Sequence, residues 1–234
     1  MGGVEVSPSP AGLRLRLVGP LELLSGCRQL SEVTPYPPAG ELLCPVGAAP
    51  VERIRLRFTL LGGRDVVNLS YPLHGVVYAG GGRDAVSAER AYGGDGYDQL
   101  IARRAFGGQG KDTLSGANPE TGTPRTPGNA LFGGLGNDEL RAPGRLYGGP
   151  GDDHLGEGYF AASKDMMVGG PGRDTVGLSG DGRRDVVRVR GGGSDRVGCA
   201  SSALDVVFAD RSDRLEDCED ATVLYTERPR YPYP

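Results

Sequence analysis

The sequence predicts an all-β protein, a right-handed parallel β-roll or β-solenoid with one edge of glycine turns, one edge of variable loops, and a cap at each end. The motif Gly-Gly-x-Gly-x-Asp-x-apolar occurs five times between residues 93 and 176, and such serial repetition is typical of stacked coils. A three-residue strand precedes each motif at a fixed distance. With 38% hydrophobic residues and no tryptophan, the chain suits the narrow apolar ladder of a solenoid better than one large core.

Residues 1–60 are expected to form a β-rich N-terminal cap. The segment LRLRLV at 13–18 is predicted to be a short strand, and VERIRLRFTL at 51–60 alternates apolar with polar residues as a half-buried strand does. A solenoid needs such caps because its terminal coil otherwise exposes an unpaired strand edge. LLGGRDVVNL at 60–69 then has the form of an eroded first repeat, with its aspartate at Asp65.

The solenoid itself is assigned to residues 61–178. The aspartates of a degenerate first copy and the five full motifs follow one another at steps of 14, 14, 26, 15 and 21 residues: Asp84, Asp98, Asp112, Asp138, Asp153 and Asp174. Nine residues before each later aspartate, the chain enters a three-residue strand that ends at Gly-Gly. The glycine turn and both strands of a coil therefore have constant length, and all variation falls in the second turn. The longest of these second turns includes GANPETGTPRTPG at 116–128.

Strand alternation predicts which side chains form the core. The inward residues of the strand after each aspartate are Leu100, Leu114, Leu140, Leu155 and Val176, and those of the strand before each Gly-Gly are Ala91, Ala105, Leu131, Leu146 and Met167. A mostly aromatic stack is expected on the outside: Tyr92, Phe106, Phe132, Tyr147 and Val168. Cross-strand packing explains this stack, and a stripe that binds carbohydrate or a protein partner is the alternative.

The repeated turn has the chemistry of a calcium site. Glycine allows backbone conformations that turn carbonyl oxygens toward one point, and the aspartate adds a carboxylate. Calcium takes six to eight oxygen ligands, so two stacked turns are needed for each ion. In the alternative, a metal-free solenoid, the aspartates would only accept hydrogen bonds from backbone N–H groups, a task that Asn or Ser would perform equally well.

These motifs resemble the RTX, or hemolysin-type, calcium-binding repeat over roughly residues 80–176. The resemblance implies about five Ca²⁺ ions between coils, held by the motif aspartates, of which Asp84 is the weaker candidate. It implies carbonyl ligands at the second and fourth glycines: Gly94, Gly96, Gly108, Gly110, Gly134, Gly136, Gly149, Gly151, Gly170 and Gly172. Lys111 and Arg173 add positive charge at the fifth motif position, so we expect weaker sites there or side chains that point away.

Residues 179–226 are expected to form degenerate C-terminal coils and a cap. Aspartates recur there at about ten-residue steps, Asp185, Asp195, Asp205 and Asp213, and Asp195 after three glycines is the best further calcium candidate. The pattern DRVGC…LDVVFAD…DRLEDCED is similar to the end of secreted actinobacterial calcium-binding repeat proteins. Residues 227–234 are a proline-rich tail.

Four cysteines form two local pairs, Cys27 with Cys44 and Cys199 with Cys218. Their even number at the two ends of the repeats favours two disulfides and an oxidising compartment. Four free thiols or a zinc site are the alternatives, but the chain has no CxxC and only two histidines, His74 in a loop and His154 on an outward strand position. We therefore expect an extracellular protein, although no signal peptide is visible after Met1.

The remaining features narrow the function classes. A net charge of −4 excludes a nucleic-acid binder that relies on bulk positive charge, and no apolar run is long enough for a membrane helix. HExxH and GxSxG are absent, so we expect no enzyme. The sequence predicts a monomeric, secreted solenoid whose folding depends on calcium; a calcium-stiffened adhesion module for glycan or protein, and a structural matrix component, are the alternatives.

Overall fold

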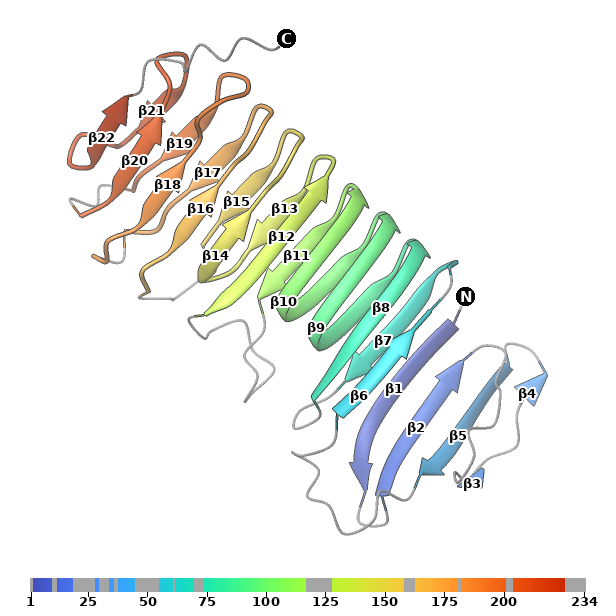
Figure 1. Ribbon diagram of the computed structural model, residues 1–234. Helices are drawn as coiled ribbons and strands as arrows, with labels where there is room; N and C mark the ends of the chain where they lie inside the picture. Colours follow the sequence, from blue (N-terminus) through green and yellow to red (C-terminus); the bar gives the residue numbers. More distant parts are fainter. Residues whose placement is uncertain are drawn as a thin grey trace.

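The computed structural model confirms a parallel β-solenoid of about eight turns (Figure 1). It describes residues 55–60, 62–69, 74–116, 128–157, 163–180, 182–200 and 204–225, together with the backbone of the strands within residues 2–44. These residues contain strands and turns and no helix. In the part of the chain so described, no helix is long and apolar enough to span a membrane.

A β-rich unit lies at the N-terminal end of the stack, as predicted. Strands β1 (Gly2–Ser9), β2 (Gly12–Val18) and β5 (Pro38–Cys44) form an antiparallel meander, and β3 (Arg28–Gln29) and β4 (Thr34–Pro35) pair with β5. The predicted strand at 13–18 is thus confirmed as β2. Strand β1 also pairs in parallel with β7 (Asp65–Leu69), which closes the first coil. The predicted Cys27–Cys44 disulfide and residues 51–54 lie outside the described side chains.

The solenoid has two parallel faces. The entry sheet contains the strands that lead into the glycine turns: β6 (Arg55–Thr59), β8 (His74–Gly82), the second halves of β9 (Ala85–Gly96) and β10 (Gln99–Gly110), β12 (Asn129–Leu135), β14 (Gly144–Tyr147), β16 (Met166–Val168), β18 (Val186–Arg188), β20 (Val206–Ala209) and β22 (Thr222–Tyr225). The exit sheet contains the strands that follow the aspartates: β7, the first halves of β9 and β10, β11 (Thr113–Gly116), β13 (Glu139–Arg141), β15 (His154–Gly156), β17 (Thr175–Gly177), β19 (Arg196–Gly198) and β21 (Arg214–Glu216).

Two details differ from the sequence prediction. Strands β9 and β10 each run through 12 residues and serve both sheets, whereas two separate three-residue strands were predicted for these coils. Only one residue, Glu89 in β9 and Arg103 in β10, separates the residues paired in the two sheets, so each strand continues from one sheet into the other without a break. His74 begins strand β8 and does not lie in a loop.

The core follows the predicted alternation. All ten predicted inward residues are at most 1% exposed, and they form two ladders in register, for example Leu114 beside Leu140 and Leu131 beside Leu146. In β6, Leu56, Phe58 and Leu60 are half-buried while Arg57 and Thr59 are exposed. The pattern of alternation was therefore sufficient to place the core.

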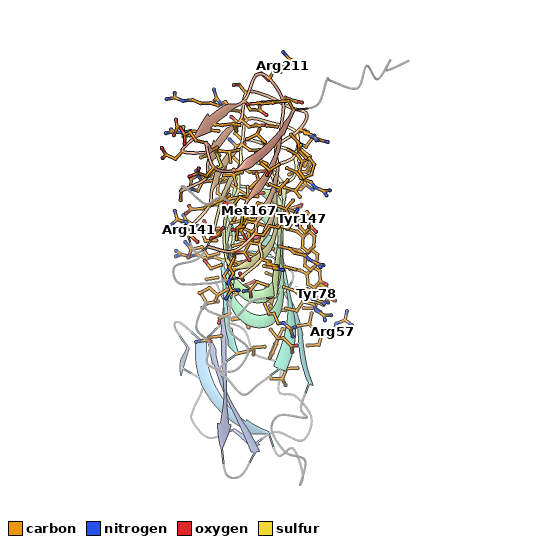
Figure 2. The ribbon with its side chains drawn as sticks, turned by 90° about the vertical axis from the view of Figure 1, so that its left-hand side faces the viewer. Arg57, Tyr78, Arg141, Tyr147, Met167 and Arg211 are labelled. Carbon is orange, nitrogen blue, oxygen red and sulfur yellow. A yellow bond between two sulfur atoms is a disulfide. The ribbon has the colours of Figure 1, made fainter. Side chains whose placement is uncertain are left out.

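The predicted outer stack is present and is one ring longer. Tyr78 precedes Tyr92, Phe106, Phe132 and Tyr147, with ring centroids 4.6–4.8 Å apart and interplanar angles of 2–8°. Figure 2 shows Tyr78 and Tyr147 on the same side of the stack. Each inner ring has both faces covered by its neighbours, so the stack presents ring edges to solvent. This geometry stiffens the entry sheet and leaves few flat ring faces on which a sugar could stack.

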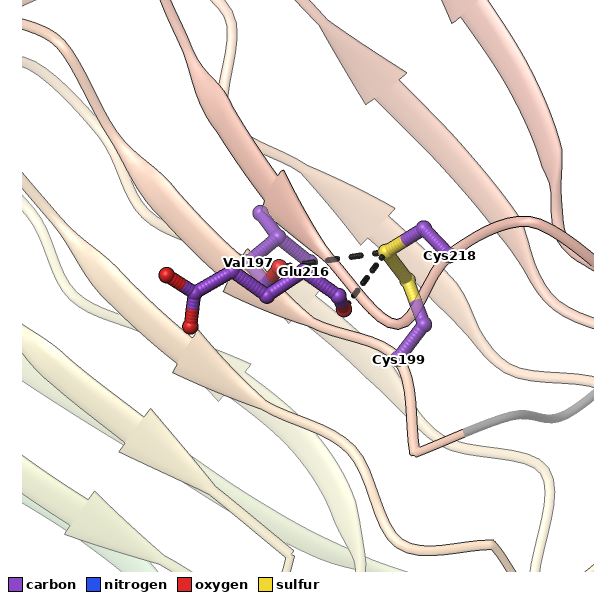
Figure 3. Close-up of a disulfide and its surroundings, with 4 residues drawn as sticks. All are labelled: Val197, Cys199, Glu216 and Cys218. Atoms are coloured by element: carbon purple, nitrogen blue, oxygen red, sulfur yellow. Dashed lines mark hydrogen bonds between the residues drawn. A yellow bond between two sulfur atoms is a disulfide. The ribbon is translucent and has the colours of Figure 1, made fainter.

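The C-terminal coils continue both sheets to β21 and β22. The predicted Cys199–Cys218 disulfide is present, with Cα atoms 4.9 Å apart, and it joins two successive coils (Figure 3). The Cys218 Sγ lies 3.3 Å from the carbonyl oxygen of Glu216 and 3.8 Å from that of Val197. Residues 226–234, which include the predicted tail, lie outside the described part of the chain.

Candidate metal centre in the aspartate columns

One edge of the solenoid carries a column of nine aspartates, which we call the first column. Its members are Asp65, Asp84, Asp98, Asp112, Asp138, Asp153, Asp174, Asp195 and Asp213. The Oδ1 atom of each aspartate after the first accepts a hydrogen bond of 2.7–3.1 Å from the backbone N–H of the preceding aspartate. The six predicted candidates therefore lie in a single file, extended by Asp65, Asp195 and Asp213.

The glycine turns lie beside this column and are stacked almost atom on atom. The second and fourth glycines have positive φ, +110° at Gly94 and +144° at Gly96, a conformation that other residues rarely adopt. A Cβ at Gly96 would collide with the carbonyl oxygen of Gly82 in the preceding coil. The turns also hydrogen-bond to one another, as in the 2.9 Å bond from the Gly136 N–H to the Pro150 carbonyl. The motif glycines thus permit both the bend and the close stacking.

The second carboxylate oxygen of the column has a different environment. In seven of these residues the Oδ2 atom is buried and has no hydrogen-bond partner: Asp84, Asp98, Asp112, Asp138, Asp153, Asp174 and Asp195. Each of these side chains is at most 2% exposed. An unpartnered buried carboxylate oxygen is costly, and here it recurs in successive coils. Each of these oxygens is therefore positioned to hold a proton or to meet a cation.

The first glycine of each motif faces this oxygen. A Cβ on Gly93 would collide with Asp98 Oδ2 and would lie 2.6 Å from the carbonyl oxygen of Gly107. The same pairing of a carboxylate oxygen with the next coil's carbonyl oxygen recurs at Gly107, Gly133 and Gly148. Since these first glycines have no positive φ, space rather than backbone conformation requires glycine there.

Sequence reasoning missed these first-glycine carbonyls. It placed the carbonyl candidates at the second and fourth glycines; the Gly94 oxygen, for example, lies within collision distance of the point that a Cβ on Gly108 would occupy. The carbonyls that converge with a carboxylate are those of Gly107, Gly133, Gly148 and Gly169. The signal was in the sequence, because all five full motifs begin with two glycines, not one.

Burial raises the pKa of these carboxyl groups. The pKa of Asp112 rises from 3.8 to about 6 because burial removes water from the charged form; the neighbouring Asp138 raises it further, and the hydrogen bond from Asp98 lowers it. The pKa values of Asp153 and Asp195 rise to about 7, again mainly through burial. Desolvation therefore outweighs repulsion between carboxylates as the reason why the charged form is unfavourable.

The fifth motif position forms a separate, exposed file. The Asp152 N–H donates to Asn137 Oδ1 at 2.9 Å, and the Arg173 N–H donates to Asp152 Oδ1 at 2.9 Å. The Arg173 guanidinium lies 3.5 Å from Asp152 Oδ2 and is 72% exposed. Lys111 is also exposed. These positive side chains point away from the buried oxygens, so they do not neutralise the first column.

A second column lies on the opposite edge in the C-terminal half. The N–H groups of Gly144, Asp165 and Asp185 donate to the Oδ1 atoms of Asp165, Asp185 and Asp205, at 2.7, 2.7 and 3.1 Å. The ten-residue step of the C-terminal aspartates therefore alternates between edges: Asp185 and Asp205 belong to the second column, Asp195 and Asp213 to the first. In the coil before Gly144, the position that corresponds to the second column is occupied by Asn129, which pairs with Gly144.

Comparisons with known proteins add no family. No protein-family model matches the chain, and neither the curated proteins nor the solved structures contain a significant match. The arrangement of the residues is therefore the basis for any functional assignment.

Proposed function

We propose that this chain is a secreted calcium-binding solenoid whose folding and stability depend on Ca²⁺ bound along the first column, between stacked glycine turns. One observation carries the proposal, namely the recurrence of a buried carboxylate oxygen without a partner in seven coils. Such an oxygen must be protonated or must meet a cation. Each of four intact turns also brings a neighbouring carbonyl oxygen to the carboxylate, as a cation site requires.

The donor atoms favour calcium over other metals. Carboxylate and carbonyl oxygens are ligands for hard cations, and calcium accepts them in loose geometry. Thiolate and imidazole ligands, which zinc and copper prefer, do not contribute: among the described residues the two cysteines form a disulfide, and His154 is exposed on β15. The resemblance of the motif to the RTX repeat is consistent with the same ion.

Secretion is part of the proposal because the C-terminal coils contain a disulfide. A disulfide such as Cys199–Cys218 forms and persists mainly in oxidising environments. Extracellular calcium modules have dissociation constants of about 10⁻⁴–10⁻³ M, so weak sites suffice there. In a reducing, calcium-poor compartment, the disulfide would open and the carboxylates would lack their ion.

A charge-removing substitution in the first column tests the proposal. In Asp112→Asn, the amide oxygen can still accept from the Asp98 N–H, and the new N–H₂ group faces the Gly133 carbonyl. In metal-free buffer at pH 8, the variant should be more stable than the wild type, because it buries no charge. With about 10 mM calcium the order should reverse, since the variant lacks a ligand. Thermal unfolding followed by circular dichroism measures both, and calorimetry counts the bound ions.

Glu139→Gln is the matched control. Glu139 lies on the exit sheet in a 2.7 Å ion pair with Arg141, and the two side chains are 39% and 53% exposed. The stability of this variant should therefore differ from that of the wild type by at most about 1 kcal/mol with or without calcium. The proposal is wrong if calcium neither binds the wild type nor raises its melting temperature, or if Asp112→Asn binds as many ions as the wild type does.

A further inference from the structure

A second group of carboxylates lies on the opposite edge, away from the motif turns. Ligand oxygens of Glu157, Asp165 and Asp185 all lie within 4.8 Å of one another. Glu157 follows strand β15, Asp165 precedes β16, and Asp185 precedes β18 of the next coil. Two successive coils therefore supply the three groups, which we call the acidic triad.

The oxygens of the acidic triad are held in place by the backbone and by two serines. The Asp185 Oδ1 accepts from the Asp165 N–H at 2.7 Å. The Glu157 Oε2 accepts from the Ser179 N–H at 3.1 Å and from the Ser179 hydroxyl, and the Ser163 hydroxyl donates to Asp165 Oδ1. Each carboxylate thus has one oxygen fixed by a donor, which orients the rest of the group.

The remaining oxygens point to a ligand. Asp185 is fully buried, and its Oδ2 atom has no hydrogen-bond partner; the Glu157 Oε1 atom is also buried without a partner. The carboxyl groups of these two residues are close enough to interact directly. When both carboxyl groups are ionised, buried acceptor oxygens this close together repel each other, and either a shared proton or a cation between them removes the repulsion.

We propose that the acidic triad is a separate binding site for one calcium-sized divalent cation. The dimensions agree, because two oxygens bound to the same ion at about 2.4 Å are at most about 4.8 Å apart. Three carboxylates and two nearby hydroxyls form an oxygen-only donor set, which selects a hard cation. Magnesium is disfavoured because it keeps several of its waters, whereas the unpartnered oxygens here are buried.

This site differs from those proposed along the first column. It has no Gly-Gly-x-Gly turn, since GEGYF and ASKD surround its first two ligands. One of its ligands, Glu157, belongs to neither column. An ion at the triad would connect the coil of Asp165 to that of Asp185 on the edge where the chain has its variable second turns. The first column would connect the same coils on the other edge.

Anomalous scattering from crystals of the full chain grown with Mn²⁺ tests the site directly. Manganese shares calcium's preference for oxygen ligands. We expect an anomalous difference peak about 2.1–2.6 Å from oxygens of Glu157, Asp165 and Asp185. No peak there in wild-type crystals that bind manganese elsewhere overturns the inference. Peaks at the triad but not along the first column would support this site and contradict the proposed function.

Paired variants measure the contribution of the site in solution. Glu157→Gln keeps the size of the side chain and its acceptor for Ser179, and it should bind one calcium ion fewer by native mass spectrometry, or bind that ion at least about tenfold more weakly. Asp112→Asn should lose column ions and retain the triad ion, and Glu139→Gln should lose neither. An unchanged ion count in folded Glu157→Gln overturns the assignment. If that variant does not fold, the wild-type anomalous peak still decides.

Discussion

In the absence of calcium, the stability of this protein should depend on pH in the direction opposite to that of most proteins, falling as the pH rises. Carboxylates that are stabilised in the folded state make a protein weaker in acid. Here burial raises the pKa values of the first column above their unfolded value of 3.8, to about 6 for Asp84, Asp112 and Asp174 and to about 7 for Asp153 and Asp195. The metal-free solenoid should therefore lose stability steadily as the pH rises from about 4 to 8.

The magnitude follows from proton linkage. A group with a raised folded pKa stabilises the fold fully below its unfolded pKa, and that contribution disappears as the pH rises through the folded pKa. Between pH 5 and pH 8, a carboxyl group with a folded pKa of about 6 removes at most about 1.4 kcal/mol, and one at about 7 removes at most about 2.6 kcal/mol. Several such groups together approach the whole stability of a typical domain, about 5–15 kcal/mol.

Urea unfolding of calcium-depleted protein at pH 5, 6, 7 and 8, followed by circular dichroism, measures this dependence. We expect the free energy of unfolding to fall across the series. Saturating calcium should flatten or invert the trend, because the ion binds the ionised carboxylates and competes with protons. A metal-free protein whose stability stays level or rises from pH 5 to pH 8 would refute the reasoning, since the column carboxylates would then have another source of neutralisation.

Two further predictions concern how successive coils are held together. Gly110→Ala should abolish cooperative folding or lower the free energy of unfolding by more than about 4 kcal/mol, because its Cβ would collide with the Gly96 carbonyl at a φ of +132°. Gly156→Ala is the control, since its Cβ would meet open space, and its thermal unfolding should be nearly that of the wild type. Reduction of the Cys199–Cys218 disulfide, which closes a loop of 19 residues, should lower the free energy of unfolding by about 3 kcal/mol. The double variant Cys199→Ala/Cys218→Ala should show the same loss without reductant. An unchanged melting temperature would contradict this prediction.

The fold was predictable because its sequence signals are local and repeated. The nine-residue interval before each motif aspartate fixed the register, and the observed pairs, such as Leu140 beside Leu155 and Phe106 beside Phe132, follow from it. The continuous strands β9 and β10 were not predictable in the same way. Both contain the same short strands as the later coils, and only the length of the connection between the exit strand and the entry strand decides whether the two merge into one continuous strand.

The candidate site was predictable in position but not in detail. The motif identified which aspartates share an edge, because a fixed turn puts them in one file. It could not show that Oδ1 accepts a backbone hydrogen bond while Oδ2 remains unpartnered, since this depends on the stagger between neighbouring coils. The acidic triad was harder still to predict from the sequence. Glu157 and Asp185 are 28 residues apart, and no repeated motif connects them.

The chain contains its own comparison between a charged and a neutral residue at such a turn. Asn129 occupies the register of the second column, where its Nδ2 donates to the Pro143 carbonyl at 3.0 Å. An amide can therefore hold a buried turn of this solenoid without a charge. The first column nevertheless has aspartate at all nine positions, although an asparagine there could keep the Oδ1 hydrogen bond and offer a donor to the nearby carbonyl. Stacking alone does not require the charge, whereas binding of a cation does.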